Sequence, residues 1–283
     1  MPPRRRRDHA VTAGTVATQG LVVEGLCKRY GNHAAVDHVS FALAPGASLA
    51  LVGESGSGKT TTVRMLVGLE RPDAGTVRLG GRDRSARVRT RTERLSRARE
   101  IQMVFQDPYL SLDPRITAAG CVDEVLRLHT RLDTTARRAR VAELLEQVGL
   151  GEREASALPR RLSGGQRQRV AIARALAVEP SVLVLDEAVA ALDVSIQAQI
   201  LELLSMIRRE AGIGYLFVTH DLAVVRHIAD EVLVLKSGRV VESGPTGHVL
   251  DAPRHPYTRL LLESVPRRGW DPGAAVSGRR SPG

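Results

Sequence analysis

The stretch GESGSGKT at residues 53–60 places the strongest limit on how this chain can fold. It fits the pattern GxxxxGK[ST], in which glycines allow backbone N–H groups to wrap around a phosphate. An apolar run at 48–53 is typical of a buried strand, and apolar residues at helical spacing follow the stretch up to residue 69. A strand, a glycine loop and a helix in this order predict an α/β domain that holds a phosphorylated ligand at the start of the helix.

The loop predicts ATP and Mg²⁺ as ligands. In this pattern Lys59 reaches the β and γ phosphates, and the hydroxyl of Thr60 can ligate Mg²⁺. A glycine-rich turn with a surface lysine is the ordinary alternative, but the strand and the helix on either side disfavour it. The residues expected to contact the nucleotide here are Gly53, Glu54, Ser55, Gly56, Ser57, Gly58, Lys59, Thr60 and Thr61.

The apolar strand SVLVLD ends in two acidic residues, Asp186 and Glu187. An acidic residue at the end of a buried strand is costly unless it serves a cation or a ligand, and ligands bind at the carboxyl ends of strands in open α/β sheets. We expect Asp186 to hold Mg²⁺, and Glu187 to orient and polarise an attacking water. Alone, the pair could be a strand running into an acidic turn. The phosphate loop in the same chain favours the catalytic interpretation.

A second phosphate-binding pattern, LSGGQ, lies at residues 162–166, directly before an amphipathic helix. A serine and two glycines at a helix start can bind an anion through backbone N–H groups. A flexible, capped helix start is the alternative. One chain with one ATP has no evident use for two γ-phosphate sites. We therefore expect two chains packed head to tail, each nucleotide lying between one chain's loop and the other chain's Ser163, Gly164, Gly165 and Gln166.

The rest of the chain alternates strand-like and helix-like stretches. Apolar strands at 181–186, 212–219 and 231–236 are separated by stretches of helical periodicity. This order is expected for a parallel sheet covered by helices. Residues 82–99 are basic and polar, and we expect them to form a linker.

The net charge of +10 raises the question of a nucleic-acid partner. Residues 1–9, 82–100 and 267–283 together hold 16 of the 41 basic residues but only five of the 31 acidic ones. The remaining chain is therefore close to neutral, and the sequence disfavours nucleic acid as a partner.

Composition excludes other classes of protein. With 43% hydrophobic and 25% charged residues, the chain is not expected to be disordered as a whole. Its two cysteines are far apart in sequence and support neither a disulfide framework nor a metal cluster. No apolar run approaches the roughly 20 residues that a membrane span needs. We expect a soluble, intracellular chain.

Six elements occur in the order and rough spacing of the ATPase subunits of ABC transporters: residues 53–60, Gln106, LSGGQ, Asp186-Glu187, Asp193 and His220. The chain resembles that family over about residues 21–250. The resemblance implies an α/β P-loop NTPase (RecA-like) core that hydrolyses ATP. It also implies an antiparallel β subdomain, built largely from 21–45 and 75–105, and an α-helical signature subdomain at about 107–172.

The resemblance also implies roles for single residues. Tyr30 would stack on adenine, Asp193 would cross the interface between two ATPase chains, and His220 would contact the γ-phosphate. Gln106 would link Mg²⁺ to the docking site of the membrane partner. From the residues alone, packing could explain Tyr30, and a bond to a backbone carbonyl could explain His220. The expected catalytic set is Glu187, His220, Lys59 and Gln106, and the expected Mg²⁺ ligands are Thr60, Gln106 and Asp186. Ordinary structural roles are expected for five other histidines: His33, His38, His129, His227 and His248.

Two stretches resemble the group of oligopeptide, dipeptide and nickel importers: QDPYLSLDPR at 106–115 and RHPYTRLLL at 254–262. The resemblance implies an ATPase that energises import of peptides, or of a related solute such as nickel, at the cytoplasmic face of the membrane. Its implied partners are two transmembrane permease subunits, a second ATPase subunit, identical or related, and, indirectly, an extracytoplasmic solute-binding protein. The alternatives are a soluble ABC ATPase of DNA repair or translation, and a regulatory dimer that ATP locks without significant hydrolysis.

These patterns divide the chain into three expected parts. Residues 1–20 are expected to be a disordered basic leader, and 21–250 the nucleotide-binding domain. Residues 251–283 are expected to be an importer-type C-terminal segment, with a proline-started helix, that ends in a loose tail.

Overall fold

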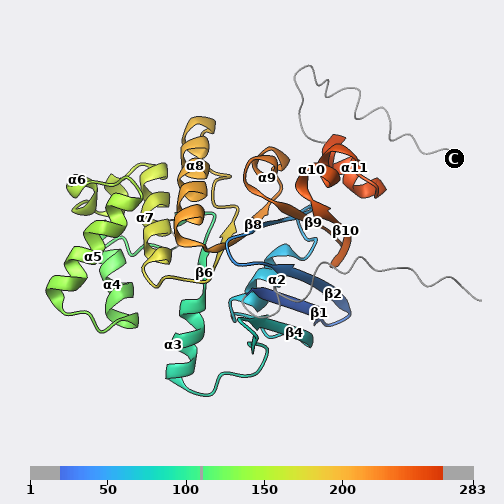
Figure 1. The fold of residues 1–283 in the computed structure, drawn as a ribbon, viewed down its shortest axis with the longest axis horizontal. Coiled ribbons are helices and arrows are strands. Elements are labelled where there is room, and N and C mark those ends of the chain that lie inside the picture. The colour runs from blue at the N-terminus through green and yellow to red at the C-terminus, as the bar shows by residue number, and fades with distance from the viewer. Residues whose placement is uncertain (1–19, 109–110, 264–283) are drawn as a thin grey trace, which may run out of the picture.

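The computed structural model of the protein describes residues 20–108 and 111–263, in which two sheets pack on either side of helix α2 (Lys59–Leu66) (Figure 1). One apolar cluster joins Val63 and Leu66 of α2 to residues of both sheets, among them Leu21 and Leu51. The predicted leader, apart from residue 20, and the tail at 264–283 lie outside the described residues.

The central sheet is largely parallel, as predicted. Its strand order is β10-β9-β3-β8-β7-β6, and β10 is antiparallel to β9. The strands are β3 (Ser48–Val52), β6 (Ile101–Val104), β7 (Val182–Asp186), β8 (Gly214–Thr219), β9 (Glu231–Lys236) and β10 (Arg239–Pro245). Since β3, β6, β7 and β8 run in one direction, the residues that follow them meet at one edge of the sheet.

The second sheet is antiparallel, in the order β2-β1-β4-β5. Its strands are β1 (Leu21–Tyr30), β2 (His33–Leu43), β4 (Ala74–Leu79) and β5 (Arg82–Asp83). The expectation that residues up to 105 belong to this sheet is wrong for β6, which pairs in parallel with β7. Ile101 and Val104 of β6 are buried in two different apolar clusters, and burial of this kind is typical of a central-sheet strand covered on both faces.

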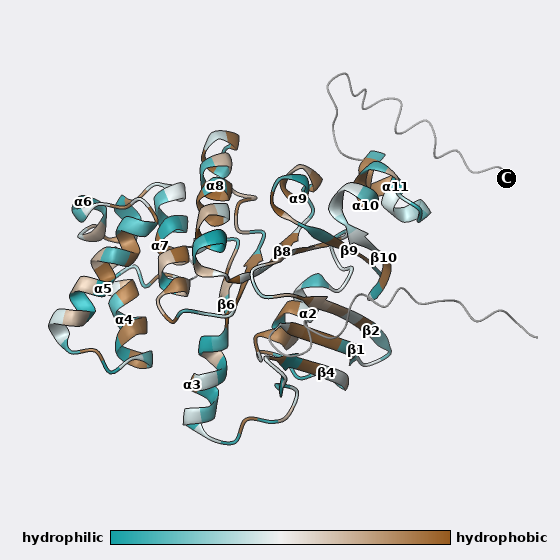
Figure 2. Cartoon of the chain, in the orientation of Figure 1, coloured by the Kyte–Doolittle hydropathy of each residue, from teal (hydrophilic) through white to brown (hydrophobic). Residues whose placement is uncertain are grey.

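The predicted linker at 82–99 is also partly wrong, because α3 (Arg91–Glu100) is a helix. The Thr90 side chain caps its start by accepting a hydrogen bond from the Glu93 amide over 3.1 Å. None of the α3 residues is buried, and Figure 2 shows the helix as mostly hydrophilic. An ion pair between Arg84 and Glu100 attaches it to the preceding segment.

Among the remaining helices, α7, α9 and α10 contact strands of the central sheet, whereas α4, α5 and α6 pack on one another, and α4 and α5 also pack on α7. Figure 1 shows α4 to α7 as a group beside α8. Their bounds are α4 (Ala118–His129), α5 (Thr134–Gln147), α6 (Glu152–Ala155), η2 (Pro159–Arg161, a 3-10 turn), α7 (Gly164–Leu176), α8 (Val194–Ala211), α9 (Leu222–Ile228), α10 (Thr246–Asp251) and α11 (Pro256–Glu263). Within the described ranges, no helix combines the length and the apolar character needed to cross a bilayer.

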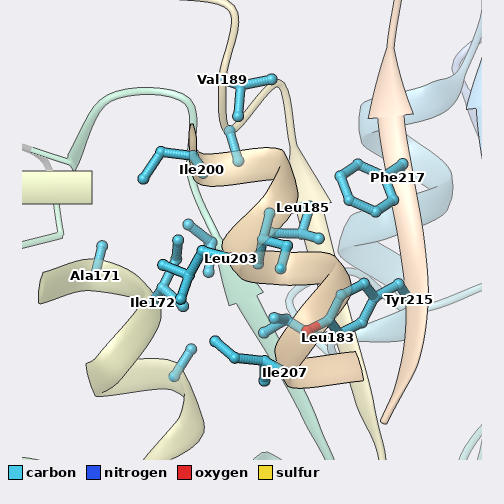
Figure 3. Close-up of a cluster of buried hydrophobic side chains, with 14 of the residues drawn as sticks. Ala171, Ile172, Leu183, Leu185, Val189, Ile200, Leu203, Ile207, Tyr215 and Phe217 are labelled. Carbon is cyan, nitrogen blue, oxygen red and sulfur yellow. The ribbon is translucent and has the colours of Figure 1, made fainter. Parts of the chain in front are cut away.

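The main core lies where α7 and α8 pack on the sheet (Figure 3). Ile172 of α7, Ile200 of α8 and Leu183 of β7 are fully buried members of this core. On β8, the rings of Tyr215 and Phe217 meet edge to face with their centroids 5.9 Å apart. This packing joins the helical group to the strands that end at the site described next.

Candidate functional site

A cavity of about 850 Å³ lies where the central strands end. The loops after β3, β6, β7 and β8 supply its phosphate-loop, glutamine, acidic and histidine residues, respectively. The end of β1 and the start of β2 supply another part of its wall. The lining residues are Tyr30, His33, Ala35, Ser55, Gly56, Gly58, Lys59, Thr60, Thr61, Gln106, Asp186, Glu187 and His220.

The phosphate loop requires its glycines because backbone atoms lie close to it. Gly58, the residue before α2, has φ 104°, and a Cβ there would overlap the carbonyl oxygen of Ala35. Gly53 has φ 154°, and a Cβ there would overlap the carbonyl oxygen of Leu235. Among the described residues, no side chain caps the start of α2. An uncapped helix start beside a glycine loop fits the phosphates of a nucleotide.

Lys59 carries its charge into the wall of the cavity, where the residue is 8% exposed. Its Nζ donates hydrogen bonds to the carbonyl oxygens of Gly53, over 2.6 Å, and of Glu54, over 2.8 Å. Burial lowers the pKa of Lys59, against the opposing attraction of Glu187 and Asp186. A phosphate bound beside the ammonium group would offset the free-energy cost of burying its charge.

Asp186 and Glu187 lie beside each other at the end of β7. Burial raises the pKa of Asp186, and the charge of Glu187 raises it further, while Lys59 opposes both. Thr60, Gln106 and Asp186 all line the cavity and offer hard oxygen ligands. These residues fit Mg²⁺, because a divalent cation there would offset the repulsion between the two carboxylates.

Glu187 has a strained backbone, with φ 48°, in the left-handed region that non-glycine residues rarely adopt. Its amide donates to the carbonyl oxygen of Val218 over 2.8 Å, which ties β7 to β8 at the site. Its Oε1 lies 3.1 Å from Nδ1 of His220. Glu187, which follows β7, and His220, which follows β8, were both expected to be catalytic, and they are in contact.

The expected site residues outside the phosphate loop that do not line this cavity are Ser163, Gly164, Gly165, Gln166 and Asp193. They lie instead at the starts of α7 and α8. The Ser163 Oγ accepts from the Gln166 amide over 3.2 Å, and Gln166 Oε1 accepts from the Ser163 amide over 2.9 Å. Asp193 caps α8 by accepting from the Ile196 amide over 3.0 Å. A Cβ on Gly165 would lie 2.5 Å from Cγ2 of Ile196, so the two helix starts are packed closely together.

Some positions in and around the cavity differ from the expected set. Gly53, Glu54 and Ser57 belong to the phosphate loop but do not line the cavity. His33, which we expected to have an ordinary role, lies on its wall, opposite Tyr30 in the β1–β2 register. The intervening Gly31-Asn32 pair is a hairpin-turn signal that could have placed His33 beside Tyr30.

A second cavity of about 280 Å³ shares Gln106 with the first. Gly164 of α7 lines it together with Leu192, which precedes α8. Gln106 therefore lies between the cavity lined by Lys59 and the helix starts that carry LSGGQ and Asp193.

Two family models match the chain. The model described as "ABC transporter" matches residues 36–190, and the model described as "Oligopeptide/dipeptide transporter, C-terminal region" matches residues 241–280.

Similar curated proteins include the di/tripeptide transport ATP-binding protein DppF of Pseudomonas aeruginosa, which is 42% identical over 93% of this chain and 80% of its own length. The glutathione import ATP-binding protein GsiA of Escherichia coli K12 is 50% identical over 82% of this chain, which spans 37% of that protein.

Solved structures with this fold include cbiO1 of Clostridium perfringens, with a TM-score of 0.74 and 30% identity over 82% of this chain and 90% of that one. The dimeric ATP-binding cassette MJ0796 bound to ADP and Pi has a TM-score of 0.71 and 32% identity over 80% of this chain and 98% of that one.

Proposed function

Since this chain belongs to the ABC transporter family and is one of its ATPases, we propose that it energises the import of peptides through separate permease subunits. The observation that carries the proposal is the C-terminal match at 241–280, a region described for oligopeptide and dipeptide transporters, on a chain that also has the cavity with Lys59 and Glu187. Nickel is the alternative cargo, because the stretch at 106–115 resembles the group that includes oligopeptide, dipeptide and nickel importers.

In the proposed mechanism, the adenine of ATP lies against Tyr30, a lining residue of the cavity that is 47% exposed. The phosphates lie on the loop before α2. Lys59 neutralises the β and γ phosphates. Mg²⁺, held by Thr60, Gln106 and Asp186, would supply further charge neutralisation and orient the phosphates.

Glu187 accepts a hydrogen bond from the attacking water and takes its proton as the water oxygen bonds to the γ-phosphorus. The bond from that phosphorus to the oxygen of the ADP leaving group then breaks. The 3.1 Å contact with Nδ1 of His220 holds the Glu187 carboxylate in place, and His220, which also lines the cavity, would contact the γ-phosphate.

The proposed active unit is a head-to-tail dimer with a second copy or a related subunit. Ser163, Gly164, Gly165 and Gln166 would contact the γ-phosphate held by the partner chain, and Asp193 would cross the interface. Their position at the starts of α7 and α8, off the wall of their own chain's cavity, supports this arrangement. ATP binding would close the dimer, and hydrolysis would open it.

Gln106 would carry this motion to two transmembrane permease subunits at the cytoplasmic face of the membrane, because its position is shared by both cavities. An extracytoplasmic solute-binding protein would deliver the peptide, and no nucleic acid would take part. The proposed parts of the chain are the leader at 1–20, the nucleotide-binding domain at 21–250, with a helical subdomain at about 107–172, and the C-terminal segment at 251–283.

The two alternatives are less well supported. A soluble ATPase of DNA repair or translation does not account for the transporter-type C-terminal match. A regulatory dimer without significant hydrolysis does not account for the paired Glu187 and His220 at the phosphate end of the cavity.

The test is reconstitution of the full-length chain with its co-purified permease in vesicles that contain ATP. We expect ATP-dependent uptake of a labelled tripeptide in the presence of the solute-binding protein, and loss of both uptake and phosphate release in Glu187→Gln. Unlabelled dipeptide, glutathione and nickel added as competitors identify the cargo. An active ATPase whose vesicles take up no peptide would contradict the peptide assignment and leave the ATPase assignment intact.

A further inference from the structure

The C-terminal segment makes direct contact with the phosphate loop. Tyr257, the second residue of α11, is 4% exposed, and its hydroxyl oxygen accepts a hydrogen bond from the Glu54 amide over 3.0 Å. The two residues are 203 positions apart in the sequence. Figure 1 shows α10 and α11 together beside β9 and β10, on the side of the central sheet opposite the helical group.

The position of Tyr257 is fixed by its surroundings. The Glu242 carboxylate on β10 accepts hydrogen bonds from the amides of Arg254, over 2.8 Å, and His255, over 3.1 Å. The Nζ of Lys236, at the end of β9, lies 4.7 Å from the centre of the Tyr257 ring. The start of α11 is therefore attached to the β9–β10 hairpin from both sides.

The same hairpin supports the phosphate loop at a second point. The amide of Gly238, in the turn between β9 and β10, donates to the carbonyl oxygen of Ser57 over 2.9 Å. Leu235 of β9 presents the carbonyl oxygen that leaves no room for a Cβ on Gly53. The hairpin and Tyr257 thus form one continuous support behind the loop.

Glu54 is held at both ends of its backbone. Its carbonyl oxygen accepts from Lys59 Nζ, and its amide donates to Tyr257. The neighbouring Gly53 and Gly56 have positive φ and little intrinsic preference for one conformation. A hydrogen bond from outside the loop therefore restricts the directions of the amides that must converge on a phosphate.

We propose that Tyr257 is a positioning residue for the nucleotide, through which the C-terminal segment sets the affinity of the phosphate loop for ATP. The inference rests on the proposed nucleotide site at residues 53–61. Tyr257 does not line the cavity, so its hydroxyl acts on the loop and not on the reacting atoms. Its loss should weaken nucleotide binding and leave the chemical step at saturating ATP nearly unchanged.

The experiment compares Tyr257→Phe with Tyr215→Phe in the full-length chain. Both variants remove one oxygen atom from a buried tyrosine, but the Tyr215 hydroxyl has no hydrogen-bond partner among the described residues and lies in the core on β8. We expect Tyr257→Phe to raise KM for ATP and the Kd of ATP and ADP by about three- to tenfold, with kcat within about twofold of wild type. Tyr215→Phe should leave all of these values unchanged.

Hydrogen exchange gives a second readout that does not depend on turnover. In Tyr257→Phe, peptides that contain the Glu54 amide should exchange faster than in wild type, whereas peptides from β7 and β8 should not. An unchanged KM and unchanged exchange at Glu54 would overturn the proposal, and so would equal effects of both tyrosine variants. Failure of the wild-type chain to bind ATP would instead contradict the nucleotide site itself.

Discussion

The starts of α2 and α7 carry two glycine-rich sequences that both predict phosphate binding, yet the chain builds them differently. Within the described residues, the α2 start has no side-chain cap and opens on a cavity lined by Lys59 and two carboxylates. The α7 start is closed by reciprocal hydrogen bonds between Ser163 and Gln166. The first start opens on a cavity formed by one chain, while the second is a capped helix end that, in the proposed dimer, contributes to catalysis only through a partner.

The two helix starts therefore need their residues for different reasons. At the phosphate loop, the charge of Lys59, held by two loop carbonyls, and the geometry of the backbone would serve the proposed nucleotide directly. At LSGGQ, the residues that would meet the partner's phosphate also shape the start of α7: Ser163 and Gln166 cap it, and Gly165 lets it pack closely on α8. Substitutions at the two starts should therefore affect ATP binding by the single chain very differently.

The largest effect is expected for Lys59→Ala. The change removes the cation that lies between the loop carbonyls and the carboxylates of Asp186 and Glu187, and the γ-phosphate loses its compensating charge. We expect hydrolysis to fall by about 100-fold or more, with weaker ATP binding by the single chain. Phosphate release and nucleotide titration measure both. Hydrolysis within tenfold of wild type would remove Lys59 from the assigned role.

Gly165→Ala should be the next most damaging change. Its Cβ would lie 2.5 Å from the Ile196 side chain, so α7 and α8 must separate at their starts. We expect a loss of about 1–3 kcal/mol in the free energy of unfolding and lower hydrolysis by the dimer, with unchanged ATP binding by the single chain.

Gly164→Ala is the matched control for stability, because its Cβ would lie 3.6 Å from Leu192, an ordinary contact. Alanine is also the better helix former, so this variant should be as stable as wild type or slightly more stable. Equal destabilisation by both alanines in denaturant unfolding would contradict the packing argument.

Ser163→Ala tests the cap of α7 and should cost about 1 kcal/mol in the free energy of unfolding. Ser163→Asp keeps a capping oxygen, so its stability should return toward wild type. The added negative charge should still impair hydrolysis by the dimer, because it would face a phosphate. If Ser163→Asp hydrolyses ATP normally, the LSGGQ serine does not meet a γ-phosphate.

The smallest effect on stability is expected for Asp193→Asn, because asparagine caps a helix as well as aspartate does. Hydrogen bonds from the amide of Ile196 and from the Ser195 side chain lower the pKa of Asp193. A lowered carboxyl pKa stabilises the folded state above the unfolded pKa, and this stabilisation is lost as the pH falls through the folded value. Any advantage of wild type over Asp193→Asn in thermal unfolding should therefore disappear at acidic pH, and an advantage that grew with acid would contradict the capping role.

Much of the site could be predicted because it depends on parallel strands. Residues that directly follow β3, β6, β7 and β8 must meet at one edge of the sheet, whatever the details of packing. The contact of Tyr257 with Glu54 could not be predicted, because it joins segments 203 residues apart through side-chain packing. For the capping roles of Ser163 and Asp193, the only indication in the sequence is that each residue directly precedes a helical pattern.

The differences between the predicted elements and the observed fold have identifiable causes. The helix α3 has no buried residue and hence no apolar period, although Thr90 and Glu93 form the spacing typical of a helix start. The strand β10 has no counterpart among the expected strands, although Ser237-Gly238 is a dipeptide typical of turns. Both residues adopt positive φ in a two-residue hairpin turn. Local turn and capping signals would have corrected both.

The glycines of the two helix starts differ in what stands opposite them. Gly53 and Gly58 face main-chain oxygens, those of Leu235 and Ala35, whereas Gly165 faces the side chain of Ile196. A main-chain oxygen is present whichever residue occupies its position. In a genetic screen, a lesion at Gly165 should thus be suppressible by a smaller residue at position 196, while lesions at Gly53 and Gly58 should revert only to glycine.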